Sequence, residues 1–149
     1  MKARVVSIKL LAGLVLFSSL LLISCEKSTG GNLTPQFQWE LNNTGYYQAS
    51  ANAYTNNIEA RSTVGPNIKH LEVSLHSVDA FPVGAYTMDY TFGNVIGFWD
   101  ESSPGSAVSS MAGTFSVTKK VDNRISGTFD VTLSDGTNLS GDFKNLELE

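Results

Sequence analysis

Side chains that could bind a metal ion lie close together in one short segment of the chain. Four polar residues at even spacing would share one face of a β-strand, namely His70, Glu72, Ser74 and His76. Neighbours on a strand face lie about 7 Å apart, so His70 and Glu72 could share a metal ion that His76 would not reach. The residues between them are mostly apolar, which is equally typical of a sheet face in water. The chain has no other histidine. We therefore expect no metal site and no cofactor, and His70 and Glu72 are the candidate ligands if a metal binds.

Residues for covalent or acid–base catalysis form no recognisable set. No serine lies in a Gly-x-Ser-x-Gly motif, in which a sharp turn exposes the nucleophile. Asp89, Asp100 and Glu101 could supply two carboxylates for glycoside hydrolysis, but nothing in the sequence places two of them at the required separation. We therefore expect that the protein is not an enzyme. A hydrolase is the third of three functional hypotheses.

Aromatic and amide side chains alternate along residues 46–54 and form the best lead to a ligand. One face of this strand would carry Tyr46, Gln48, Ser50, Asn52 and Tyr54, whereas the opposite face is mostly alanine. Trp99 adds a further ring, because Phe98 and Trp99 must point to opposite sides of their strand. Flat rings beside amides suit sugars, which have an apolar face and a rim of hydroxyl groups. The alternative is a second sheet that packs on this side and buries the tyrosines.

The first 25 residues have the order of a bacterial export signal. Three basic residues precede an apolar run over residues 10–23, which is short for a membrane-spanning helix of about 20 apolar residues. The run ends in Leu22-Ile23-Ser24-Cys25, which resembles the bacterial lipobox in its aliphatic residue three places before the cysteine and its small residue just before it. The resemblance implies a thioether-linked diacylglycerol on Cys25, cleavage before this residue and acylation of the new amino terminus. An ordinary signal peptide with an incidental cysteine is the alternative.

Charge and cysteine content agree with an anchored envelope protein. Cys25 is the only cysteine, so the exported chain can form no internal disulfide. Without residues 1–24, seven Lys and Arg remain against fourteen Asp and Glu, which leaves a formal net charge of −7. An acidic domain is repelled by nucleic acid and by anionic lipid, so contact with the membrane is expected through the N-terminal lipid alone. We expect the protein to be in the outer membrane. The residues after Cys25 lack the strongly acidic run that directs some similar lipoproteins to the cell surface, so the sequence does not specify the leaflet.

The rest of the chain divides into a tether and one domain. Residues 25–35 are small and polar, as expected of a flexible tether. Residues 36–149 alternate between apolar and polar positions and show no helical period, so they predict an all-β domain. About nine strands joined by short turns favour an antiparallel β-sandwich or a small open β-barrel. One predicted strand runs through Tyr86, Met88, Tyr90 and Phe92 to a tight hairpin at Gly93-Asn94.

A glycine–phenylalanine pattern recurs every 14 residues near the C-terminus, as Gly113-Thr114-Phe115, Gly127-Thr128-Phe129 and Gly141-Asp142-Phe143. We interpret it as three antiparallel strands in a meander, since three short units are few for a solenoid. The turn over residues 133–137 suits a type I turn with Gly136 in the left-handed conformation. Pairing Leu133 with Thr137 would set Phe129 opposite Gly141 and Gly127 opposite Phe143. Aromatic rings would then cover the glycines.

The lipobox, Gly84-Ala85-Tyr86 and the closing Gly-x-Phe strands together resemble an uncharacterised group of small lipoproteins common in Bacteroidota. The resemblance covers most of the chain after Pro35. It implies an all-β envelope protein, but no known activity and no catalytic residues. The first functional hypothesis is therefore a lipid-anchored envelope protein with a non-catalytic binding or assembly role, whose partner is a glycan or another envelope protein. The second is a ligand-binding barrel for a glycan or a small apolar molecule.

Overall fold

The computed structural model of the chain describes residues 34–63, 67–76, 80–103 and 105–149, apart from the side chain of Tyr46. The predicted signal peptide, Cys25 and most of the predicted tether lie outside these residues. Within the described ranges, no helix has the length and apolar character needed to cross a membrane.

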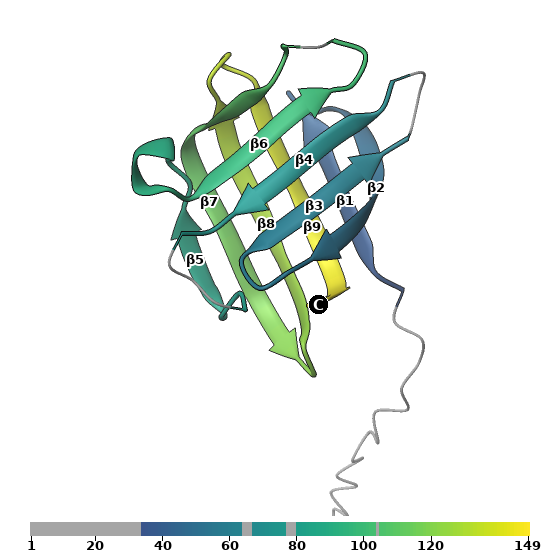
Figure 1. The fold of residues 1–149 in the computed structure, drawn as a ribbon, viewed down its shortest axis with the longest axis vertical. Coiled ribbons are helices and arrows are strands. Elements are labelled where there is room, and N and C mark those ends of the chain that lie inside the picture. The colour runs from purple at the N-terminus through teal and green to yellow at the C-terminus, as the bar shows by residue number, and fades with distance from the viewer. Residues whose placement is uncertain (1–33, 64–66, 77–79, 104) are drawn as a thin grey trace, which may run out of the picture. The chain divides into compact units, whose positions relative to one another are not determined.

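Nine strands make up the fold of the described residues (Figure 1). They are β1 (Gln36–Leu41), β2 (Thr44–Ala53), β3 (Asn57–Ser62), β4 (Lys69–Ser74), β5 (Gly84–Thr87), β6 (Val95–Asp100), β7 (Val108–Val121), β8 (Arg124–Leu133) and β9 (Asn138–Glu147). All pairings between these strands are antiparallel. The prediction of an all-β domain with about nine strands is confirmed.

The strands close into a barrel rather than leaving an open sheet. Hydrogen bonding runs in the order β7-β6-β4-β3-β2-β1-β9-β8, and β8 pairs again with β7. Closure depends on the 14 residues of β7, which pair with β6 at one end and with β8 along most of their length. The short strand β5 pairs with the middle of β7, beyond the residues of β7 that pair with β6. Figure 1 shows β3, β4 and β6 crossing in front of β7, β8 and β9, so the barrel is built as two layers.

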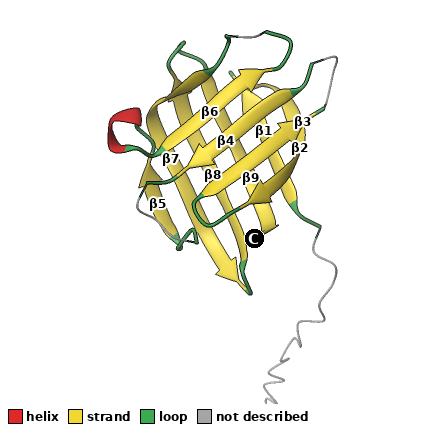
Figure 2. Cartoon of the chain, viewed as in Figure 1, coloured by secondary structure: helices red, strands yellow, loops and turns green. Residues whose placement is uncertain are grey.

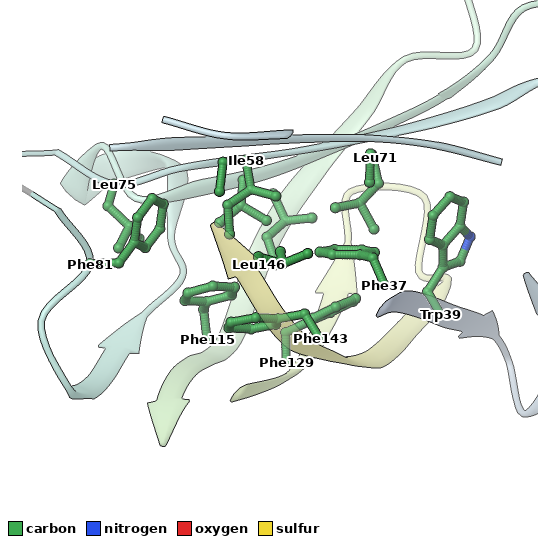
Figure 3. Packing of buried hydrophobic residues seen from close by; sticks show 14 of the residues in the cluster. Phe37, Trp39, Ile58, Leu71, Leu75, Phe81, Phe115, Phe129, Phe143 and Leu146 are labelled. Carbon is green, nitrogen blue, oxygen red and sulfur yellow. The ribbon is translucent and has the colours of Figure 1, made fainter. Parts of the chain in front are cut away.

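Side chains fill the interior of the barrel, because the alternation of each strand turns its apolar residues inward. Phe115 and Phe143 stack with ring centroids 5.1 Å apart. Phe37 stacks on Phe129 and on Phe143 at 5.7 and 6.1 Å (Figure 3). Trp39 and the aliphatic residues of the facing layer complete the core. An eight-stranded barrel is narrow enough for side chains alone to occupy it.

Two glycines of the 14-residue pattern, Gly127 and Gly141, lie where aromatic rings leave no room for a side chain. Residues 133–137 form the predicted turn, in which Gly136 has a φ of 83° and the Leu133 amide donates to the Thr137 carbonyl over 2.8 Å. This register sets Gly127 opposite Phe143 and Phe129 opposite Gly141, as predicted. A Cβ atom at Gly127 would lie 2.6 Å from Cζ of Phe143.

The predicted strand through Tyr90 and Phe92 is wrong. β5 ends at Thr87, and Tyr90–Phe92 form a single 3-10 turn, η1, between β5 and β6 (Figure 2). The Asp89 carboxylate accepts hydrogen bonds from both the amide and the hydroxyl of Thr91, which stabilises the turn in place of further strand pairing. Tyr90 and Phe92 are consequently exposed. The chain reversal at Gly93-Asn94 is retained, because Asn94 bridges to Asp89.

An ion pair lies at the end of the barrel where β4 begins and β6 ends. Lys69 Nζ is 2.8 Å from Asp100 Oδ2, and both side chains are largely buried. The ammonium group also lies over the rings of Tyr47 and Phe98, at 5.7 and 5.9 Å from their centroids. A hydrogen bond from Lys69, and to a lesser extent hydrogen bonds from Ser102, hold the pKa of the Asp100 carboxyl well below its usual range. Asp100, one of the three acids considered for catalysis, is thus engaged in holding two strands together.

Candidate binding groove

Two rows of outward side chains cross the layer formed by β2, β3, β4 and β6. The register of these strands aligns one row as Ser50, Arg61, His70 and Trp99, and another as Asn52, Glu59, Glu72 and Gly97. The row between them, which includes Leu71 and Phe98, packs into the barrel core. Phe98 and Trp99 therefore point to opposite sides of β6, as predicted.

A groove of about 510 Å³ lies on this outer face. Its lining comes from both rows and includes Asn52, Glu59, Arg61, His70, Glu72 and Trp99. Gly97 leaves the second row without a side chain on β6, and a Cβ atom there would have no neighbour within 4 Å. The face is therefore open beside Trp99.

The two rings in the groove are held flat against each other. The imidazole of His70 and the indole of Trp99 stack with centroids 4.9 Å apart and an angle of 1° between their planes. His70 Nε2 lies 2.6 Å from Glu101 Oε1, and this same oxygen lies 3.6 Å from a guanidinium nitrogen of Arg61. Glu101 thus links Arg61 to the ring pair and fixes the orientation of the imidazole.

The second row places two carboxylates side by side. Glu59 and Glu72 are direct partners across β3 and β4. The amide of Asn57 donates to Glu72 Oε1 over 2.8 Å, but this donor is neutral. Like charges directly opposite each other in a sheet are unfavourable. The groove therefore combines a stacked pair of rings with two neighbouring carboxylates.

Five of the residues singled out from the sequence meet in this groove: Ser50, Asn52, His70, Glu72 and Trp99. Gln48 lies nearer the start of β2 than Asn52 and is exposed. Tyr54 directly follows the end of β2 and has 36% of its surface exposed. The side chain of Tyr46 is outside the described residues. Because Tyr54 is exposed, the alternative that a second sheet buries the tyrosines is wrong for this residue.

Sequence reasoning missed Arg61 and Glu59 as members of the site. Their alternation with the buried residues Ile58 and Ala60 was the available signal that they face outward. That signal does not say which neighbouring strand completes the face. The contact of Glu101 with His70 depends on pairing between β4 and β6, which are separated in the chain by β5 and η1.

Of the residues considered as metal ligands, only His70 and Glu72 lie on the outer face of β4. His76 lies beyond the end of β4, where its side chain lies against Gly93. Among the residues that the structure describes, no group of three or more His, Cys, Asp and Glu side chains is arranged to hold a metal ion.

The described residues form a small closed β-barrel with a cluster of buried apolar side chains inside it and a polar groove lined by two aromatic rings on its outer face. No family model, curated protein or solved structure matches the chain.

Proposed function

We propose that the chain is a lipid-anchored protein of the cell envelope, placed in the outer membrane, whose barrel binds a carbohydrate in the outer groove without catalysis. The observation that carries the proposal is the flat pair of His70 and Trp99 beside hydrogen-bonding side chains in one groove. The proposed lipid anchor rests on the lipobox-like segment Leu22-Ile23-Ser24-Cys25.

The chemistry of the groove fits a sugar ring. The ring faces that the stack of His70 and Trp99 leaves uncovered offer an apolar surface for the C–H face of a pyranose. Asn52, Arg61 and Glu72 place donors and acceptors next to this surface, where they can meet the hydroxyl groups at the rim of the sugar. Buried apolar side chains, among them Phe37, Trp39 and Phe143, pack inside the described part of the barrel. The outer groove is therefore favoured over an interior site for a small apolar molecule.

Glycoside hydrolysis is the second candidate function, because Glu59 and Glu72 both line the groove. Hydrolysis by two carboxyl groups requires that they flank the scissile bond. These two acids project from adjacent strands of one sheet face, so both would lie on the same side of a bound sugar. This placement favours a binding role for them.

The test compares Trp99→Ala with the native protein, each extracted from the membrane in detergent micelles. We expect a glycan screen followed by calorimetry to find a ligand with micromolar to millimolar affinity, since a shallow site of this kind binds weakly. Loss of the stacking surface should weaken binding about tenfold, at the upper end of what ring stacking contributes.

Tyr90→Ala is the matched control, because Tyr90 is an exposed ring on η1 that does not line the groove. It should bind as the native protein does. Equal binding by Trp99→Ala and the native protein would contradict the proposal. Release of reducing ends from the bound glycan would favour the hydrolase instead.

A further inference from the structure

We infer that the groove selects carbohydrates that carry free, protonated amino groups over neutral or N-acetylated ones. This inference rests on the proposed function and specifies the ligand class of the same site.

The balance of charge in the groove is the first argument. Its lining contains two carboxylates, Glu59 and Glu72, and one guanidinium group, on Arg61. Arg61 is within ion-pair distance of Glu101, which lies just outside the lining and also contacts His70. Neither Glu59 nor Glu72 forms an ion pair within the described part of the chain. The groove therefore has an excess of negative charge that a cationic ligand would neutralise.

The placement of the two carboxylates is the second argument. As direct partners across β3 and β4, Glu59 and Glu72 repel each other in the absence of a cation. An ammonium group has three N–H donors and can be shared by two carboxylates. An amine bound between them would thus gain two charge-assisted hydrogen bonds and remove the repulsion.

The aromatic rings and the missing side chain at Gly97 supply the third argument. Gly97 is the direct partner of Glu72 and lies two residues before Trp99, so no side chain stands beside the tryptophan on that side. A sugar ring placed on Trp99 would therefore extend over Gly97 toward Glu72. The negative face of the indole also attracts cations. Both features favour a sugar whose substituent is an amine, and acetylation would remove the charge that they recognise.

The experiment measures calorimetric binding of three tetrasaccharides to the detergent-extracted protein: β-1,4-linked glucosamine, N-acetylglucosamine and glucose. We expect the glucosamine tetramer to bind at least tenfold more tightly than either of the others. Glu59→Gln and Glu72→Gln should each reduce this preference severalfold, because each substitution should weaken binding of the glucosamine tetramer much more than binding of the glucose tetramer. Glu40→Gln is the matched control, because Glu40 faces outward on β1, away from this groove, and should leave the preference intact.

The outcomes separate this inference from the function on which it rests. Equal affinity for the three tetramers, each weakened by Trp99→Ala, would overturn the amine preference and leave carbohydrate binding standing. A preference that survives in the Glu59→Gln, Glu72→Gln double variant would also overturn it. Absence of binding to any of the three, together with no hit in the glycan screen, would overturn both.

Discussion

Gly127→Val should destabilise the barrel by about 3 kcal/mol, at the upper end of what overpacking a core costs. A Cβ atom at Gly127 would lie 2.6 Å from Cζ of Phe143 and would also collide with the backbone carbonyl oxygen of Ser116. The phenylalanine ring cannot move aside easily, because it stacks against Phe115 and Phe37. The backbone oxygen belongs to β7, the strand that closes the barrel. Urea unfolding, monitored by tryptophan fluorescence, gives the free energy of unfolding of each variant.

Gly97→Val is the control for this substitution. Gly97 also lies within a strand, but a Cβ atom there would meet nothing within 4 Å. Valine has a higher β-propensity than glycine, so this variant should be as stable as the native protein or slightly more stable. If Gly127→Val unfolds at the same urea concentration as Gly97→Val, the account of ring-covered glycines is wrong.

Cys25→Ala should abolish lipid attachment completely, since the thiol is the only group in the chain that can form the thioether. The native protein should incorporate labelled fatty acid and partition into the detergent phase. The variant should incorporate none and should accumulate as a precursor that retains its signal peptide. The effect on anchoring is large because each buried methylene of an acyl chain contributes about 0.8 kcal/mol to membrane binding.

Ser24→Ala separates loss of the thiol from a general disturbance of the cleavage region. Alanine keeps a small residue directly before the cysteine, so this variant should be acylated and processed normally. Mass spectrometry of the purified amino terminus distinguishes the forms. A Cys25→Ala protein that is cleaved normally and stays in the membrane would show that the anchor lies elsewhere.

Local chemistry explains which parts of the fold could be predicted from the sequence. The pairing of β8 with β9 follows from one short turn, because Gly136 determines the turn and the turn determines the register. Period-two alternation likewise explains why Phe37 and Trp39 face inward on β1. Such features depend on residues that are near each other in the chain.

Contacts between distant segments explain what could not be predicted. Closure of the barrel requires β7 to pair with β6 and β8 together, and the sequence pattern of β7 does not specify either partner. The alternation of Tyr86, Met88, Tyr90 and Phe92 suggested one strand, but side-chain hydrogen bonds from Thr91 to Asp89 produced η1 instead.

The site was predictable in its members more than in its arrangement. Asn52 and Trp99 were expected to face outward, and they do so in one groove. His70 was considered as a metal ligand, whereas the structure stacks it on Trp99 and places its Nε2 beside Glu101. That contact requires strand pairing across 31 residues of sequence, which alternation alone does not reveal.

The position of a bound carbohydrate tests the central claim most directly. We propose to titrate the ¹⁵N-labelled protein in detergent micelles with the glucosamine tetramer and to map the amide and indole chemical shifts. The account predicts the largest changes at Asn52, Arg61, His70 and Trp99, which surround the groove of about 510 Å³. A second groove of about 390 Å³ lies on the opposite layer and includes Glu40, Asp130 and Asp142. Changes confined to that layer, or no changes at saturating ligand, would contradict the account.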